Sequence, residues 1–426
     1  FTALKSMITR NIRKENPICT IWRVLTAEGA FTSSFFEKPK KSTQKEVVKA
    51  VKKALEKKQK IRVTATGHSF TPIVETDGLL LDLAKISGIK AVDPYKQRAF
   101  VGSGTPISAL GDPLWEKGLA LRNQGDIDSQ RIAGAISTGT HGSGTEFGSF
   151  SSILRSCRIV TGTGEVVEIN EKTPDLLHAA QVSVGMLGVM VGMELQVTKK
   201  YKLREHIDHE PFSDVMRNFH ERVKKNRNFS FFWFPSEESA ALYNIELPPG
   251  EKATDTCHVK VFNEARESEQ VSDVPKRRVD RSYRIYPMFY SPNFHELEYF
   301  IPLERSVDCI NEMREYMLKN LPLSIFPLEI RSCGSEDGFL SSNYKRETLV
   351  VSVSGMPGVD YWPYLREVDR ILCRYDARVH WGKLHFLTKQ QLHDRYPKAE
   401  KFIKIRKQFD PKGVFLNDHL RPLFAQ

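Results

Sequence analysis

A single histidine in the stretch TATGHSFTPI (residues 64–73) is the first side chain that could do chemistry. His68 stands between a glycine and a serine, directly after a run of β-branched residues. An imidazole ring titrates near neutral pH. It could therefore act as a base, bind a metal, form ordinary buried hydrogen bonds, or attach a cofactor to the chain, and the residue alone does not decide among these roles.

Glu329 and Arg331 form a second candidate group, in the segment PLEIRS (327–332). The segment has the pattern of a strand, so residues two positions apart project from the same face. A solvent-facing pair of this kind contributes little, whereas in a dry pocket the two charges would act strongly on a substrate. Lys383 is a further cation, and the spacing of the neighbouring His380 and His385 does not match a zinc-binding HExxH helix.

Two glycine-rich loops could hold a phosphate group. Backbone N–H groups in a tight glycine loop converge on an anion because no side chain obstructs them. TATGHS (64–69) and STGTHGSG (137–144) both fit this description. Neither loop is the GxGxxG of a dinucleotide fold or the GK[ST] of a P-loop, and each taken singly could be an ordinary structural turn.

Several elements must position these residues. The lysine-rich segment 38–60 carries apolar residues at helical spacing and predicts an amphipathic surface helix. A helix capped near Thr105–Ser108 is expected, with Pro106 in its first turn. Strands are expected near 61–64, 79–83 and 99–101, and the polar stretch 247–282 is expected to be an extended surface excursion.

Composition and charge limit the class of protein. The length of 426 residues favours two domains, and 40% hydrophobic with 27% charged residues is typical of a soluble globular protein. The six cysteines form no CxxC or CxxH pair, so we expect free thiols and no metal site. The net charge of +11 lies largely on the lysine-rich helix, and no nucleic-acid-binding motif accompanies it.

Membrane and secretory signals are not recognisable in the sequence. No apolar run reaches the ~20 residues that a bilayer requires. The N-terminal stretch lacks the apolar core of a secretory signal peptide. We therefore expect a soluble, cytoplasmic protein.

The order of the motifs closely resembles the flavin-binding half of the vanillyl-alcohol oxidase superfamily: a helix and a strand, then TGHS (66–69), GSGT (102–105), GAISTGTHGSG (134–144) and VGMLGVM (184–190). Within that superfamily the chain is similar to the branch of sugar-lactone and alditol oxidases. The similarity continues through FFWFP (231–235), EYFIPLE (298–304), LEIRS (328–332), VHWGKLH (379–385) and FDPKGVFLNDHLRPLF (409–424). It covers nearly the whole chain from about Phe35 onward.

This resemblance implies an α+β, two-domain fold of the vanillyl-alcohol oxidase type. An FAD-binding domain is expected over residues 1–200, and a substrate (cap) domain with an antiparallel sheet and flanking helices over 201–378. The C-terminal segment 379–426 is expected to return to the FAD domain and the active site.

The resemblance also implies FAD, attached covalently from a ring nitrogen of His68 to the 8α-methyl group of the flavin. Noncovalent FAD beside an ordinary loop histidine is the alternative. Because no cysteine occurs between Cys19 and Cys157, a second, thioether attachment is excluded.

Further cofactor contacts are carried over from the same resemblance. Backbone amides of Thr66, Gly67 and Ser69 are expected at the pyrophosphate, and Val189 near the adenosine or ribityl part. Six residues would line the flavin and its ribityl chain: Ser137, Thr138, Thr140, His141, Gly142 and Gly144. Among these, His141 is expected to be a hydrogen-bonding scaffold residue.

The catalytic residues implied by the resemblance are Glu329, Arg331 and Lys383. Arg331 would face the substrate oxygen and flavin N5, and Glu329 would orient it or bond a substrate hydroxyl. Lys383 would face the reacting hydroxyl, either as a fixed cation or, with a lowered pKa, by assisting proton removal. His380 is expected to support this group.

We therefore expect oxidation of a carbinol in an aldono-1,4-lactone of the L-gulono or D-arabinono type, with hydride transfer to the flavin and reoxidation by O2 to give hydrogen peroxide. Alditol oxidases carry a histidine on the strand where this chain has Ser352 and Ser354, which favours a lactone over an alditol. The alternatives are an alditol oxidase, a lactone dehydrogenase that uses a quinone or cytochrome, and a noncatalytic flavin-fold binding module. The expected ligands are the sugar lactone or polyol and O2, and no binding to nucleic acid is expected. The protein is expected to be a monomer or a simple homo-oligomer.

Overall fold

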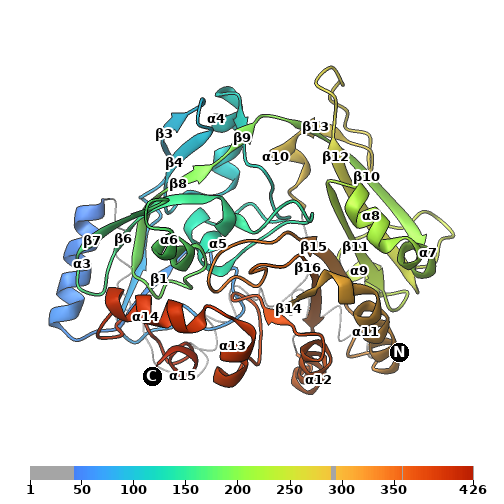
Figure 1. The fold of residues 1–426 in the computed structure, drawn as a ribbon. Helices are drawn as coiled ribbons and strands as arrows, with labels where there is room; N and C mark the ends of the chain where they lie inside the picture. Colours follow the sequence, from blue (N-terminus) through green and yellow to red (C-terminus); the bar gives the residue numbers. More distant parts are fainter. Residues whose placement is uncertain (1–42, 289–293, 357, 426) are drawn as a thin grey trace.

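The computed structural model describes residues 43–288, 294–356 and 358–425. The N-terminal stretch and Cys19, considered above, lie outside these residues. The two largest sheets lie on opposite sides of the molecule (Figure 1): one comes from the chain before about residue 200, called the N-terminal half below, and the other from the chain after it, called the C-terminal half.

The N-terminal half contains a five-stranded sheet in the order β3-β4-β8-β6-β7 and a parallel pair, β1-β2. Helices α5 (Ile132–Thr138) and α6 (Pro174–Gln181) share a hydrophobic core with the larger sheet. The predicted amphipathic helix is α3 (Gln44–Glu56), which packs with the parallel pair. The strands are β1 (Ile61–Thr64), β2 (Leu79–Asp82), β3 (Ile89–Asp93), β4 (Arg98–Gly102), β6 (Leu154–Val160), β7 (Val166–Asn170) and β8 (Val189–Gln196).

The C-terminal half contains an eight-stranded sheet in the order β13-β10-β12-β11-β15-β16-β14-β17, called the cap sheet below. Its strands are β10 (Lys202–Pro211), β11 (Asn228–Phe234), β12 (Thr256–Glu264), β13 (Val279–Arg281), β14 (His295–Pro302), β15 (Leu328–Cys333), β16 (Thr348–Gly355) and β17 (Arg378–Val379). All of the paired strands run antiparallel. The expected α+β class with an antiparallel cap sheet is confirmed.

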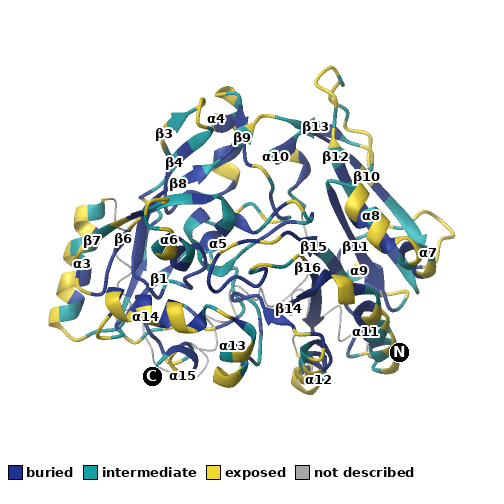
Figure 2. Cartoon of the chain, viewed as in Figure 1, coloured by how far each residue is buried: buried dark blue, intermediate teal, exposed yellow. Residues whose placement is uncertain are grey.

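Helices cover one face of the cap sheet (Figure 1). They are α7 (Phe212–Arg217), α8 (Phe219–Lys225), α11 (Ser306–Lys319) and α12 (Trp362–Cys373). Figure 2 shows the strands beneath them as largely buried, with exposed residues on the outer surfaces of the helices. In β15, Leu328 and Ile330 join this hydrophobic core, so the alternate residues of the strand are left for the opposite face.

The C-terminal segment connects the two halves. After β17 at the edge of the cap sheet, the chain forms α13 (Lys389–Arg395), α14 (Ala399–Phe409) and α15 (Arg421–Phe424). Helix α14 packs on α6, and Figure 1 shows it beside the N-terminal half. The domain boundaries at residues 200 and 378 stay predictions.

Two local expectations are wrong in part. Helical turns do begin at Ser108, as η1 (Ser108–Leu110) and α4 (Gly111–Glu116), but Pro106 lies before them and forms an isolated bridge with Arg131. The stretch 247–282 is not a surface excursion throughout, because β12 lies inside the cap sheet between β10 and β11. Its His258 and Lys260 made the strand look like a polar loop, although both side chains are buried.

The described part of the chain contains five free cysteines: Cys157, Cys257, Cys309, Cys333 and Cys373. Across the described ranges, no helix combines the length and apolar character needed to cross a bilayer.

Candidate active site

A cavity of about 1260 Å³ is lined by residues from both halves of the chain. Its wall comes from the loop after β1, from α5 and the loop that follows it, from strands β11, β14 and β15, and from the segment 380–384. Pockets for a single small ligand span roughly 300–1,000 Å³. This cavity can therefore hold a large cofactor together with a substrate.

Most of the predicted site residues line this cavity. They are Thr66, Gly67, His68, Ser69, Ser137, Thr138, Thr140, His141, Glu329, Arg331 and Lys383. Segments far apart in the sequence therefore meet at one place. The cavity brings the glycine loops to the charged residues of the cap sheet.

Three predicted cofactor residues do not line the cavity. Val189 is buried in the hydrophobic cluster around α3. A β-carbon on Gly142 would lie 2.1 Å from the carbonyl oxygen of Gln124, and the N–H of Gly144 donates to the carbonyl of Ser332. These positions serve local packing and backbone pairing, so the cavity gives their predicted cofactor contacts no support.

The loop that carries His68 leaves several backbone amides unused. Gly67 has a φ of 83°, a left-handed conformation that glycine adopts readily. Among the described residues, the amides of Thr66, Gly67 and Ser69 donate to no protein group. Unused N–H groups in a glycine turn suit an anion such as a pyrophosphate, so this part of the cavity fits FAD.

The ring of His68 lies at the cavity wall, with Nε2 3.0 Å from Oγ of Ser129. Burial, and then the nearby Lys383, lower the pKa of His68, so the ring is neutral at pH 7. When Nε2 of a neutral ring donates to the serine, Nδ1 keeps its lone pair. His68 then has one nitrogen able to act as a nucleophile.

Arg331 lies between two carboxylates. Its Nη2 donates to Oε1 of Glu298 at 2.6 Å and lies 3.3 Å from Oε2 of Glu329. Burial raises the pKa of Glu329 to about 7 against the opposing effect of Arg331. Burial would also raise the pKa of Glu298, but Arg331 and His141 hold it well below its usual range. The site therefore combines a permanent cation with one carboxylate that titrates near neutral pH.

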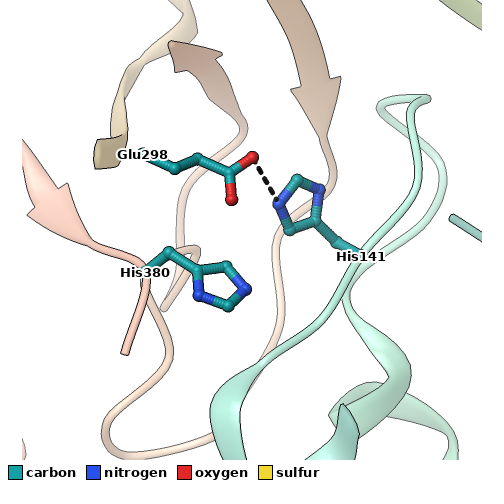
Figure 3. Close-up of side chains that lie close together, drawn as sticks. All are labelled: His141, Glu298 and His380. Carbon is teal, nitrogen blue, oxygen red and sulfur yellow. Dashed lines mark ion pairs between the residues drawn. The ribbon is translucent and has the colours of Figure 1, made fainter. Parts of the chain in front are cut away.

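Glu298 also lies beside two histidines (Figure 3). Nε2 of His141 is 3.3 Å from Oε1 of Glu298, and Nδ1 of His141 is 2.8 Å from the carbonyl oxygen of Gly142. Nδ1 of His380 accepts a hydrogen bond from the N–H of Gly382 at 3.0 Å, and burial lowers the pKa of His380 to about 3. Two histidines and a carboxylate with ligand atoms within 4.8 Å of one another have the composition of a metal site.

The hydrogen bonds of this cluster nevertheless fit a metal poorly. His380 uses its Nδ1 lone pair for the Gly382 amide, so Nε2 of the neutral ring carries the proton and has no lone pair to give. Arg331 already contacts the same carboxylate, and a metal ion there would face the positive guanidinium. We therefore interpret His141, Glu298 and His380 as the hydrogen-bonded support of Arg331.

Lys383 enters the cavity from the C-terminal segment and forms an ion pair with Glu296. Glu296 also accepts a hydrogen bond from the hydroxyl of Ser352. The ammonium group lies 4.9 Å from the centre of the Phe70 ring, in the loop that carries His68. The ion pair with Glu296 thus holds the side chain of Lys383 at the cavity wall.

Sequence reasoning missed Glu296, Glu298 and Ser129. For the two carboxylates a signal existed: in HELEYFIP (295–302) acidic residues alternate with the apolar Leu297, as in a strand with one polar face. Their partners could not be read from the sequence, because β14 is brought beside β15 only through β16 in the folded sheet. Ser352 and Ser354 both lie on β16: the hydroxyl of Ser352 donates to Glu296, and Oγ of Ser354 lies 3.2 Å from the hydroxyl of Tyr243.

Comparison with known sequences follows the same division of the chain. Residues 40–170 match the FAD binding domain family, and residues 251–423 match the D-arabinono-1,4-lactone oxidase family. The L-gulono-1,4-lactone dehydrogenase of Mycobacterium tuberculosis is 31% identical over 425 residues, which cover 94% of this chain and 98% of that protein. The L-gulonolactone oxidase of Mus musculus is 26% identical, with 89% of this chain and 93% of that protein covered. The alditol oxidase of a Streptomyces species is also 26% identical, with coverages of 84% and 89%.

Solved structures support the fold. Cholesterol oxidase from B. sterolicum superposes with a TM-score of 0.77 at 14% identity, covering 91% of this chain and 93% of that one. The 6-hydroxy-D-nicotine oxidase from Arthrobacter nicotinovorans gives a TM-score of 0.66 at 17% identity, with coverages of 88% and 89%. With the sequence matches along nearly the whole chain, these findings establish that the chain belongs to the FAD-binding flavoproteins of the vanillyl-alcohol oxidase type, in the aldonolactone and alditol oxidase branch.

Proposed function

We propose that the protein is an FAD-dependent aldonolactone oxidase. It oxidises a carbinol of an L-gulono- or D-arabinono-1,4-lactone and passes the electrons to O2, releasing hydrogen peroxide. The observation that carries this proposal is the presence of Glu329, Arg331 and Lys383 in one cavity with the His68 loop. Relatives that are named for aldonolactone chemistry support the substrate class.

The proposal includes covalent attachment of FAD through His68. Bound FAD supplies the acceptor for the hydrogen that leaves the carbinol carbon as hydride. The unused amides of the His68 loop, the size of the cavity and the neutral ring of His68 all support this attachment.

The chain's own groups handle the proton and the developing charge. Arg331 binds the carbinol oxygen and stabilises the negative charge that grows as the hydroxyl ionises, and Lys383, held in its ion pair with Glu296, faces the reacting hydroxyl. Glu329 accepts the hydroxyl proton, and a carboxyl pKa of about 7 suits a general base at neutral pH.

The electron acceptor has a competing assignment. The relative at 31% identity is named a dehydrogenase, which favours a quinone or a cytochrome in place of O2. The alditol oxidase at 26% identity keeps an alditol substrate as a further alternative.

The test is anaerobic reduction of the purified holoenzyme. L-Gulono-1,4-lactone and D-arabinono-1,4-lactone are added in one series, and xylitol and sorbitol in another, while the visible flavin band is followed. Bleaching by the lactones alone is the expected result. Bleaching by the alditols would assign the chain to the other substrate class.

The acceptor is then identified by reoxidising the bleached enzyme with O2, a soluble quinone or a cytochrome, and by measuring hydrogen peroxide. Fast reoxidation by O2 with stoichiometric peroxide is expected. If no sugar bleaches the flavin while dithionite does, the enzyme proposal fails and a noncatalytic binding module is favoured.

A further inference from the structure

Glu296 lies where its charge can affect whether the cavity binds a neutral or an anionic substrate. Its side chain is 6% exposed, and its carboxylate pairs with Lys383, whose side chain is 19% exposed. The hydroxyl of Ser352 holds the same carboxylate from the neighbouring strand β16. The ion pair is therefore largely shielded from water, where charge pairing is strong.

Arg331, a second cation in the cavity wall, also forms ion pairs with carboxylates. It contacts Glu298 and Glu329, as described above. Both cations of this part of the wall, Arg331 and Lys383, are therefore paired with carboxylates, and Asp126, a further carboxylate of the wall, is paired with Lys260.

Aldonolactones open in water. Hydrolysis adds water across the ester bond and gives an aldonate, a hydroxy acid that is ionised at neutral pH, without any transfer of electrons. The cavity therefore meets a neutral and an anionic form of the same sugar. Hydroxyl groups of the neutral form can bridge the ion pairs on the wall, whereas a carboxylate would have to compete with Glu296 for Lys383.

We propose that Glu296 is a specificity-determining residue that neutralises Lys383, so that the cavity admits the closed lactone and excludes the ring-opened aldonate. This inference rests on the proposed function. It assigns to Glu296 a role that is separate from proton transfer and from the support of Arg331.

Glu296 is the residue at which this idea can be tested cleanly. Glu298 also holds His141 and Arg331, so its removal disturbs several contacts. The carboxylate of Glu296 is matched to Lys383 and Ser352, and its carbonyl, which accepts from the N–H of Leu384 at 2.8 Å, is retained in any variant. Glu296→Gln removes the charge and keeps the shape.

The experiment titrates the wild-type holoenzyme, Glu296→Gln and Ser352→Ala with L-gulonate, the hydrolysis product of L-gulono-1,4-lactone. Binding is read from the shift of the flavin absorption band and from competition with the lactone in anaerobic flavin reduction. Glu296→Gln is expected to bind L-gulonate about tenfold more tightly than the wild type, or better, because Lys383 has lost its internal partner. Ser352→Ala, which keeps the carboxylate, is expected to exclude L-gulonate as the wild type does.

The inference is overturned if the wild type binds L-gulonate as tightly as the lactone, or if Glu296→Gln binds it no more tightly than the wild type. If Glu296→Gln does not load with FAD, Glu296→Thr removes the same charge and has the same expected result. Glu296→Asp should restore the exclusion. Failure of the wild type to be reduced by any lactone contradicts the proposed function instead, and it is visible without any variant.

Discussion

Glu329 is the residue whose protonation most directly controls the proposed reaction. A carboxyl group must be ionised to accept a proton, and burial raises the pKa of Glu329 to about 7. The rate of anaerobic flavin reduction by the lactone should therefore rise with pH through about 7. Glu329→Gln should remove this limb and lower the rate by roughly 10²–10⁴-fold, the usual contribution of a general base.

Stopped-flow reduction between pH 5.5 and 9 measures both effects. Glu146→Gln, at an exposed position that does not line the cavity, is the matched control and should keep the wild-type profile. An unchanged pH limb in Glu329→Gln would show that another group takes the proton.

Ser129 should control how fast FAD becomes attached. Its hydroxyl lies 3.0 Å from Nε2 of His68, and when Nε2 donates to it, the lone pair of Nδ1 is left to form the bond. A hydrogen bond contributes about 1 kcal/mol, so Ser129→Ala should slow attachment by about fivefold without preventing noncovalent binding. The covalent fraction is measured over time as flavin fluorescence on a denaturing gel and as added mass.

His68→Ala is the reference without attachment, and it should carry FAD that denaturation releases. Attachment in Ser129→Ala at the wild-type rate would mean that the contact does not orient the ring. A wild type without covalent flavin would contradict the attachment itself.

At the scale of elements, the local sequence pattern predicted the strand that carries Glu329 and Arg331, but it did not predict which side chains lie next to them. The alternation in β15 is enough to put Glu329 and Arg331 on one face. Their neighbours Glu296 and Glu298 come from β14, which joins them through β16 by long-range pairing. Long-range pairing is also the reason why β12 was not predicted. Its His258 and Lys260 indicated a polar surface segment, but the strand lies between β10 and β11 and both side chains are buried.

The opposite face of β15 should set stability without touching the chemistry. Ile330 is 1% exposed and lies across from Phe231 and Val351 in the neighbouring strands. Ile330→Ala should lower the free energy of unfolding by about 2–5 kcal/mol, the usual cost of such a cavity in a core. Val166→Ala, at a side chain that is 41% exposed, is the control and should change it by less than about 0.5 kcal/mol.

Denaturant unfolding followed by far-UV circular dichroism gives the midpoints, and the flavin spectrum before unfolding shows whether the cavity is intact. A midpoint of Ile330→Ala equal to that of the control would mean that this face of the strand is not a packed core.

At the scale of the whole molecule, the motifs were sufficient to predict the family and the fold, because the glycine-containing loops follow one another in the order that is typical of the family. The cavity itself could not be predicted in the same detail. It forms where residues near 66, 137, 329 and 383 converge, and the hydrogen bond from the N–H of Phe70 to the carbonyl of Gly382 ties two of these segments together across 312 positions. The contacts of Glu298 with Arg331 and of Glu296 with Lys383 likewise join segments that are far apart in the sequence, through the pairing of β14 and β15 with β16 and through the hydrogen bond from the N–H of Leu384 to the carbonyl of Glu296.

Because the cavity wall comes from both halves of the chain, FAD should stabilise the molecule as a whole. A ligand that binds only the folded state adds RT ln(1 + [L]/Kd), about 2.7 kcal/mol at a concentration of 100 Kd. His68→Ala stripped of FAD should therefore unfold at a lower temperature, and the midpoint should rise steadily as FAD is added back. NAD, a dinucleotide without a flavin, is the control and should leave the midpoint unchanged. An unfolding midpoint that does not change with FAD would mean that the cavity does not hold the cofactor in the folded protein. A midpoint that rises with FAD but not with NAD would mean that the flavin, enclosed by both halves of the chain, stabilises them together.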